Sequence, residues 1–110
     1  MALVIPDVLA EDCTTRQALE RLGSKWYVLL VYALLDGPHR PAELRRRIPG
    51  ISQKVLTTQL RSMERDGLVA RTVIRTAAPQ HVEYRLTPLG QTLEQPLAAV
   101  CAWATQHAMG

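Results

Sequence analysis

Apolar positions repeat with a helical period as far as Gly67, with a strand period from there to Leu86, and with a helical period again after Thr87. A helix is expected where apolar residues recur every three or four positions between glycine and proline breaks. A strand is expected where β-branched and aromatic residues alternate with polar ones. The pattern therefore predicts helices at about residues 15–22, 25–35, 41–48, 53–66 and 88–107, and strands at residues 68–75 and 81–86.

Residues with helix-capping side chains mark the beginnings of these helices. A serine or threonine hydroxyl accepts a hydrogen bond from a free amide of the first turn, and such residues precede four of the helical runs: Thr14, Ser24, Ser52 and Thr87. Thr14 and Gln17 also have the spacing of a capping box. Pro96 lies inside the last run and removes the amide that would bond to the Thr92 carbonyl, which predicts a kink there.

The order of these elements is that of a winged helix-turn-helix fold, mainly α with a small β-hairpin wing. The linker of residues 49–52 has the length of a helix-turn-helix turn, and residues 76–80 should project as the wing. A chain of 110 residues is one domain. We divide it into an N-terminal segment and helix, a winged-helix core and a C-terminal helix, at residues 1–23, 24–86 and 87–110.

Basic residues are concentrated in the segment that holds the predicted helix-turn-helix. Residues 40–65 contain seven arginines and lysines and two acidic residues, a balance of +5 in a chain of net charge +3, so the remainder carries −2. A positive patch on an acidic body suits a polyanion such as DNA and steers it electrostatically. A solvated basic surface is the alternative interpretation of this pattern.

The helix predicted at residues 53–66 has one apolar face and one face that suits a DNA major groove. At about 100° per residue, Leu56, Leu60 and Met63 fall on the side that packs against the core. The opposite side carries long donors and small hydroxyls, which reach phosphates and base edges. We expect DNA contacts from Ser52, Gln53, Lys54, Thr57, Thr58, Arg61 and Arg65. The polar face of any amphipathic surface helix is the competing interpretation.

Two flanking elements add candidates for DNA binding. Arg45, Arg46 and Arg47 on the preceding helix are expected to hold the phosphate backbone where that helix crosses it. The wing tip is flanked by residues that would enter a minor groove, where negative potential is concentrated: Arg75, Gln80 and His81. An ordinary polar hairpin explains these wing residues equally well.

Apolar residues at both ends of the chain predict an interface with a second copy. A domain of this size cannot bury the stripe of the last helix together with the apolar N-terminus, and helix-turn-helix proteins pair on palindromic half-sites. We expect an isologous homodimer built from Leu3, Val4, Ile5, Val8 and Leu9 with Leu89, Leu93, Leu97, Val100, Cys101, Trp103 and Ala104. The alternative is that the two ends pack on each other within one monomer.

Other chemistry receives little support from the sequence. Cys13 and Cys101 lack metal-ligand spacing and the three histidines are scattered, so we expect neither a metal nor a cofactor. A nucleophile pair of Cys13 with a histidine lacks any context for an oxyanion hole, which argues against an enzyme. A winged helix that binds protein without specific DNA binding is a further alternative, against which the basic face of the helix at residues 53–66 argues.

Membrane association and export are not expected. The longest apolar run, residues 26–35, is shorter than the roughly 20 residues that cross a bilayer. Residues 1–5 lack the basic flank and apolar length of a signal peptide. We therefore expect a cytoplasmic protein.

The chain resembles the HxlR-type regulators, relatives of the MarR group with a winged-helix fold. The resemblance runs from Cys13 to about His107, and its fragments, in order and correctly spaced, are specific. They are residues 18–26 (ALERLGSKW), 35–38 (LDGP), 43–45 (ELR), 49–52 (PGIS), 55–57 (VLT), 60–61 (LR), 67–69 (GLV) and 82–90 (VEYRLTPLG). The family usually has proline, glycine and an aromatic residue where this chain has Thr14, Ser24 and Pro41.

The resemblance implies a cytoplasmic, bacterial, dimeric DNA-binding regulator that reads DNA with the helix after Ser52 and dimerises through its terminal helices. In some members a cysteine at the place of Cys13 senses oxidants or electrophiles, for which a lowered pKa and solvent access are needed. A small residue packed at the dimer interface is the alternative role for Cys13. Repression from a pseudo-palindromic operator is the simplest mode of action, and a small-molecule effector between the terminal helices and the DNA-binding lobe is conceivable.

Overall fold

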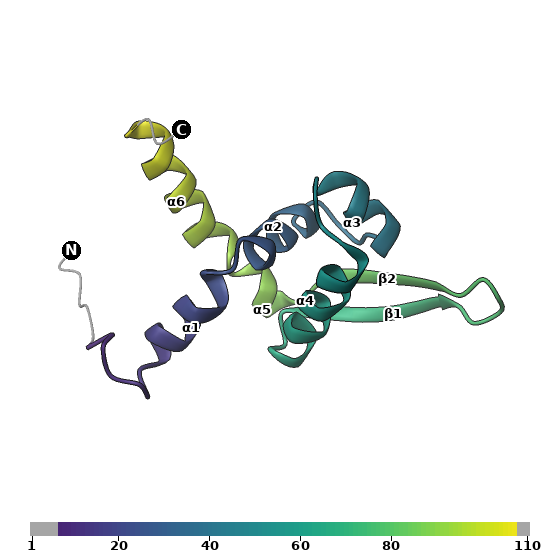
Figure 1. Cartoon of the computed structure of the whole chain (residues 1–110), viewed down its shortest axis with the longest axis horizontal. Coiled ribbons are helices and arrows are strands. Elements are labelled where there is room, and N and C mark those ends of the chain that lie inside the picture. Colours follow the sequence, from purple (N-terminus) through teal and green to yellow (C-terminus); the bar gives the residue numbers. More distant parts are fainter. Residues whose placement is uncertain (1–6, 108–110) are drawn as a thin grey trace.

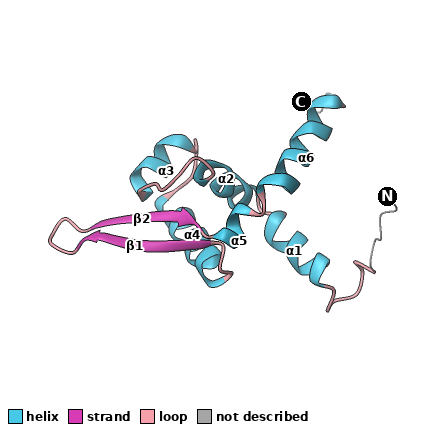
Figure 2. Cartoon of the chain, turned by 180° about the vertical axis from the view of Figure 1, so that it is seen from behind, coloured by secondary structure: helices cyan, strands magenta, loops and turns pink. Residues whose placement is uncertain are grey.

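The computed structural model describes residues 7–107 and places helices before and after an antiparallel hairpin (Figures 1 and 2). The predicted Leu3, Val4 and Ile5 of the dimer interface lie outside the described residues. The elements are α1 (Thr14–Leu22), α2 (Lys25–Leu34), α3 (Pro41–Arg47), α4 (Gln53–Arg65), β1 (Val69–Arg75), β2 (His81–Leu86), α5 (Pro88–Gln91) and α6 (Glu94–Gln106). The predicted winged helix-turn-helix order is confirmed.

Three of the four predicted helix caps are confirmed. The side chains of Ser24, Ser52 and Thr87 accept hydrogen bonds from backbone amides of the first turns of α2, α4 and α5. The capping box predicted for Thr14 is wrong, because α1 begins one residue earlier and Thr14 is its first helical residue. The N-cap is Cys13, which makes no side-chain cap bond and whose carbonyl accepts the Gln17 amide at 3.1 Å.

The hairpin is held in register by cross-strand pairs from Val69–Leu86 at its base to Arg75–His81 at its tip, with an irregularity between Val73 and Arg75. Its base is buried and its tip, the wing, stands clear of the core (Figure 1). The segment before α3 braces β2, because His39 and Tyr84 exchange two backbone hydrogen bonds of 2.9 Å. The wing therefore has a fixed base beside the helix-turn-helix.

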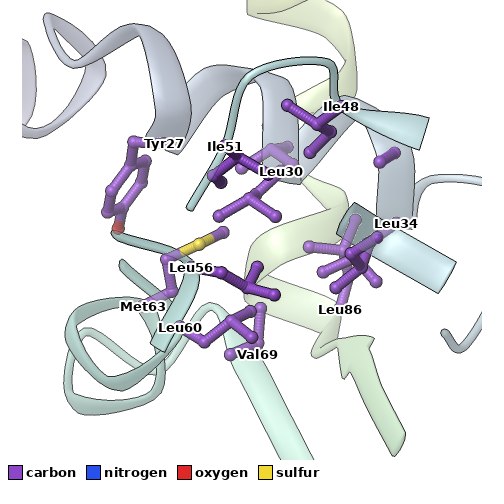
Figure 3. Close-up of a cluster of buried hydrophobic side chains, with 13 residues drawn as sticks. Tyr27, Leu30, Leu34, Ile48, Ile51, Leu56, Leu60, Met63, Val69 and Leu86 are labelled. Atoms are coloured by element: carbon purple, nitrogen blue, oxygen red, sulfur yellow. The ribbon is translucent and has the colours of Figure 1, made fainter. Parts of the chain in front are cut away.

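A single core joins α2, α3, α4 and the base of the hairpin (Figure 3). The predicted core face of α4, Leu56, Leu60 and Met63, is buried as expected. Helix α2 is apolar but not buried on every side, because on one side Leu29 is 38% and Tyr32 62% exposed in the single chain. The remaining side of α2 forms the centre of the core through Tyr27, Leu30, Val31, Ala33 and Leu34.

The long last helix predicted from residue 88 is broken into two. A kink at Pro96 was expected, but the chain breaks before it, at Thr92 and Leu93, and Pro96 lies in the first turn of α6. The amides of Thr92 and Leu93 bond three residues back instead of four. The proline ring clashes with a helical carbonyl four residues earlier, which is that of Thr92. The helix breaks at this residue.

The terminal helices α1 and α6 stand away from the core at opposite sides of its end (Figures 1 and 2). Neither contains a buried residue. The radius of gyration is 15.8 Å, compared with about 13 Å for a compact chain of this length. These two helices therefore extend beyond the globular part of the molecule.

Candidate nucleic-acid interface

Helices α3 and α4 form the helix-turn-helix, with α4 as its second helix. Gly50 makes the turn between them with a φ of 86°, a backbone conformation that favours glycine. Ile48 and Ile51 bury their side chains on either side of this turn. Because both ends of the turn are anchored in the core, the orientation of α4 relative to α3 is fixed.

The candidate DNA-contacting residues of α4 occupy one free face of the helix. Lys54, Thr58, Arg61 and Arg65 are exposed and lie opposite the buried Leu56, Leu60 and Met63. The Ser52 side chain accepts the Val55 amide at 3.1 Å, so it is committed to capping this helix. The remaining amides of the first turn point outward at the positive end of the helix dipole, an arrangement that binds phosphate.

A short chain of polar contacts orders the start of α4. Arg45 on α3 donates to the side-chain oxygen of Gln53 at 3.4 Å, and the Gln53 amide nitrogen donates to the Thr57 hydroxyl at 3.2 Å. Gln53 is exposed, Thr57 is half-buried, and both lie on the side of α4 near α3. Because these contacts already restrict the Gln53 side chain, it would lose less conformational entropy on pairing with a base.

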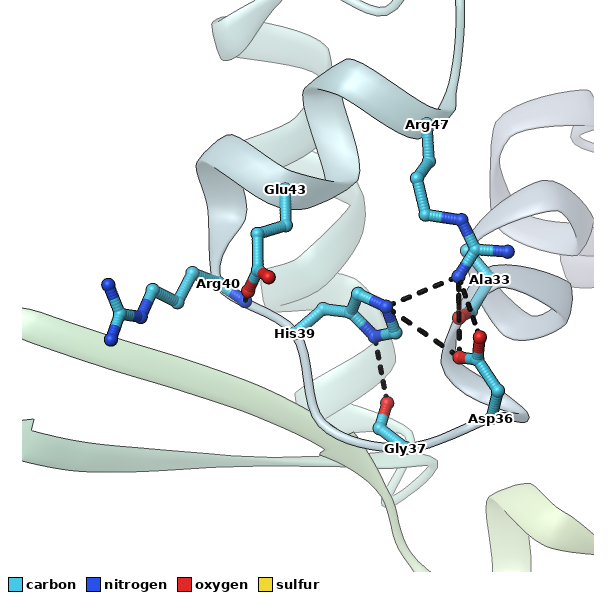
Figure 4. Close-up of polar contacts among 7 residues, drawn as sticks. All are labelled: Ala33, Asp36, Gly37, His39, Arg40, Glu43 and Arg47. Atoms are coloured by element: carbon cyan, nitrogen blue, oxygen red, sulfur yellow. Dashed lines mark hydrogen bonds and ion pairs between the residues drawn. The ribbon is translucent and has the colours of Figure 1, made fainter.

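The three consecutive arginines of α3 do not share one environment. Arg45 and Arg46 are exposed and remain candidates for phosphate contacts. Arg47 turns toward the end of α2, where its Nη1 donates to the Ala33 carbonyl at 3.1 Å and pairs with Asp36 at 3.1 Å (Figure 4). The Nε2 of His39 lies 3.2 Å from the same nitrogen. Arg47 therefore fastens α3 to α2, a role that the sequence pattern does not reveal.

The wing places its predicted residues around the tip. Arg75 and Gln80 are exposed and His81 is half-buried. Arg71, which sequence analysis did not select, is exposed on β1 two residues after the buried Val69. Alternate residues of a strand share a face, so Arg71 lies on the side of the hairpin that packs against α4. The two-residue spacing from Val69 is the sequence signal by which Arg71 could have been selected.

The predicted dimer residues divide into two groups. Leu93 and Leu97 are half-buried against the core of their own chain. Val100 is 62%, Trp103 53% and Leu9 84% exposed, Cys101 is exposed and Ala104 is half-buried. A groove of about 250 Å³ runs between α1, α2 and α6, with the apolar lining Leu19, Leu22, Gly23, Val28, Pro96, Leu97 and Val100. The terminal helices thus present one apolar surface that a single chain leaves open.

Cys13 lies at the N-terminus of α1 and is half-buried. The backbone amide of Arg16 is the largest influence on its thiol and lowers the pKa below the usual range, with help from Thr15 and against a smaller effect of burial. Helix amides favour a negative charge at this position. The geometry is that of a thiol with increased thiolate character.

A cavity of about 320 Å³ opens between α1, α2, the end of α4 and Leu93. Besides Thr14 and Gln17, its polar lining contains Arg21, Tyr27 and Asp66, and sequence analysis assigned no role to these last three. The Arg21 Nε and the Tyr27 hydroxyl donate to the same Asp66 oxygen, at 3.1 and 2.9 Å. Burial and the Asp66 carboxylate raise the pKa of Tyr27, so it stays a neutral donor. These residues are far apart in the sequence, and no local pattern links them.

Among residues 7–107, no helix has both the length and the apolar character needed to span a membrane. Within the same residues, histidine, cysteine and acidic side chains form no group of three that would hold a metal ion.

The helix-turn-helix, its preceding helix and the hairpin define a winged helix-turn-helix protein. The sequence profile of HxlR-like helix-turn-helix proteins matches residues 21–110. The chain belongs to this HxlR-like helix-turn-helix family, as the sequence fragments predicted. At this level, the prediction of a DNA-binding transcriptional regulator is confirmed.

Known relatives match most of the chain. The HTH-type transcriptional regulator YtfH of Escherichia coli (strain K12) is 41% identical over 97 residues, which are 88% of this chain and 76% of YtfH. The solved structure of the transcriptional regulator ytfH from Salmonella typhimurium is 39% identical, with a TM-score of 0.80 over 93% of this chain and 90% of that one. The redox regulator HypR in its reduced form is 38% identical, with a TM-score of 0.80 over 87% and 94% of the two chains.

Proposed function

We propose that this protein is a transcriptional repressor that binds a pseudo-palindromic operator as a homodimer. The observation that carries the proposal is the free basic face of α4, where Lys54, Arg61 and Arg65 are exposed on a helix whose opposite face is anchored in the core. A rigid helix with long donors on its outer face is what major-groove recognition requires. Repression then needs only occupancy of a site that polymerase must use.

Within this proposal each element has a separate task. Arg61 pairs with guanine, Gln53 with adenine, and Thr57 or Thr58 places a methyl on thymine, because these are the favoured geometric pairings of those side chains. Lys54, Arg65, Arg45 and Arg46 hold phosphates, and so position the reader without specifying sequence. Arg75, Gln80 and His81 of the wing, joined by Arg71, follow the adjacent minor groove.

The second copy covers the apolar surface of the terminal helices. The groove between α1, α2 and α6 has an apolar lining that can accept an apolar face. Val100 in this lining and Trp103 further along α6 are exposed. An isologous pair places each groove against the matching face of the other copy. This arrangement removes the exposed apolar area of both chains, and it carries two copies of α4 for two half-sites.

Oxidant sensing by Cys13 is a second part of the proposal. Its position at the N-terminus of α1 and its lowered pKa favour the thiolate, which is the form that oxidants and electrophiles attack. Since α1 belongs to the proposed dimer surface, modification of Cys13 would alter the pairing of the two copies. A Cys13→Ser variant that still releases operator DNA under diamide as the wild type does would contradict this role.

The DNA-reading role of α4 is tested by replacing Arg61 with alanine. With an operator selected from random duplexes, Arg61→Ala should lose discrimination of about 1–3 kcal/mol at one base position in each half-site. Lys54→Ala is the matched control on the same helix, and it should weaken binding to all sequences alike. Equal loss on all sequences for both variants would show that Arg61 reads no base.

A further inference from the structure

Three residues from three helices meet at the outer end of α4, and we call them the α1–α4 joint: Arg21, Tyr27 and Asp66. Asp66 is the C-cap residue of α4, Arg21 lies in the last turn of α1, and Tyr27 lies in the first turn of α2. The Asp66 side chain is 24% exposed and that of Arg21 52% exposed. The Asp66 carboxylate accepts one hydrogen bond from the hydroxyl of the buried Tyr27 and a second from the more exposed Arg21.

The joint is the polar attachment of α1 to the rest of the chain. In residues 7–107, the other side-chain hydrogen bond and ion pair of α1 belong to Arg16, and they reach only the Leu9 carbonyl and Glu20. No residue of α1 is buried, and its apolar attachment to the core is through Leu22 at its end. The contact of Arg21 with Asp66 is therefore the side-chain polar contact that ties α1 to the DNA-binding lobe and helps to fix the angle between them.

The joint also lies at the opposite end of α4 from the residues that would read DNA. Helix α4 has 13 residues, a length of about 20 Å at 1.5 Å per residue. Its outer end is tied to α1 at Asp66, and its other end carries Gln53, Lys54 and the first-turn amides. Because α4 is anchored in the core, it moves together with the DNA-binding lobe. A rotation of the lobe relative to α1 by about 10° at Asp66 would therefore displace the reading end of the helix, about 20 Å away, by about 3.5 Å.

We propose that the α1–α4 joint sets the distance between half-sites that the homodimer accepts on DNA. The inference rests on the proposed dimer, in which α1 belongs to the shared surface and α4 reads the groove. Adding one base pair between half-sites moves the second half-site by about 3.4 Å and turns it by about 35°. A fixed joint prevents the two α4 helices from following that change, whereas a loosened joint lets them follow. Arg21 and Asp66 are positioning residues in this account, because neither touches DNA.

The test is the affinity of wild type and variants for duplexes that carry two identical half-sites at the selected spacing, one base pair closer and one base pair further apart. Arg21→Ala should reduce the penalty for the wrong spacings by a factor between about 1.4 and 5, the range measured for partly exposed ion pairs. Arg21→Lys keeps the charge and should retain most of the penalty. Glu20→Ala, which removes the ion pair with Arg16 inside α1 and leaves the Arg16 bond to the Leu9 carbonyl in place, is the matched control and should keep the wild-type spacing preference.

The outcomes separate this inference from the proposed function. If Arg21→Ala weakens binding equally at every spacing, or changes nothing, the joint does not set the spacing and the inference is overturned. Discrimination between bases inside a half-site should be unchanged in Arg21→Ala, since Arg61 is untouched. If the wild type itself has no spacing preference and binds single half-sites, the proposed homodimer on a paired operator is overturned, and the inference with it.

Discussion

Gly90 lies where α5 crosses the base of the hairpin, and replacing it with alanine should lower the free energy of unfolding. A Cβ atom at this position would overlap the backbone carbonyl oxygen of Leu68, and it would lie 3.0 Å from the Leu86 side chain. The Leu68 carbonyl accepts the Thr87 amide at 3.0 Å, so it cannot move away without losing that bond. The overlap can be relieved only by lifting α5 from the strand.

The expected magnitude follows from three contributions. Overpacking of a tight site costs about 1–3 kcal/mol, and weakening the Thr87 hydrogen bond costs about 1 kcal/mol more. Alanine gains roughly 1 kcal/mol over glycine in a helix, which opposes both. The net loss in free energy of unfolding should be about 2 kcal/mol, a large fraction of the roughly 5–15 kcal/mol of a small domain.

Urea unfolding followed by circular dichroism measures this loss. The midpoint should fall with little change in slope, with both proteins at the same concentration because the proposed dimerisation would contribute to stability. Gln91→Ala, at the exposed neighbouring position, is the control and should change the free energy of unfolding by less than about 0.5 kcal/mol. If Gly90→Ala were as stable as the wild type or more so, helix propensity alone would govern this site and the packing argument would be refuted.

Three further predictions concern the core, the interface and the thiol. Leu56→Ala removes a fully buried side chain and should lower the free energy of unfolding in urea by about 2–5 kcal/mol. Thr58→Ala on the exposed face should lower it by less than about 0.5 kcal/mol, and similar costs for the two variants would contradict the assigned faces of α4. Val100→Glu should shift the protein toward monomer in sedimentation equilibrium, because it puts a charge on the apolar surface. Gln106→Glu at the exposed end of α6 should leave the equilibrium unchanged. An unchanged dimer in Val100→Glu would show that this face is not the dimer interface. The alkylation rate of Cys13 can be measured by mass spectrometry over a pH series. It should reach half its maximum at a lower pH in the folded protein than in the guanidinium-unfolded protein, because the Arg16 amide lowers the thiol pKa. Equal midpoints would contradict the lowered pKa.

The helix-turn-helix could be predicted from sequence because its determinants are local. Leu56, Leu60 and Met63 repeat at helical spacing, and Ser52 caps the helix that they belong to. The same holds for the hairpin, where alternation fixes both strands. Capping at Thr14 was predicted wrongly because a serine or threonine with correct spacing does not settle which residue is the last extended one, and here it is Cys13.

Contacts between distant residues could not be predicted. Arg47 is the last of three consecutive arginines, and only the fold brings it to Asp36 and the Ala33 carbonyl. Likewise, 45 positions separate Arg21 from Asp66, and neither lies in a pattern that anticipates the other. At Pro96 the local rule identified the disturbed carbonyl, that of Thr92, but did not show that the helix would break there instead of bending.

The central claim is tested most directly by selecting duplexes from a random pool with the purified protein and measuring the binding of the selected sequence. The account predicts a pseudo-palindrome bound by two copies of the chain, with an affinity that falls steeply as salt rises because several phosphates are neutralised. It also predicts much weaker binding to a scrambled duplex. If no sequence is enriched and binding stays weak and unspecific at every salt concentration, the basic face of α4 does not read DNA and the account is wrong.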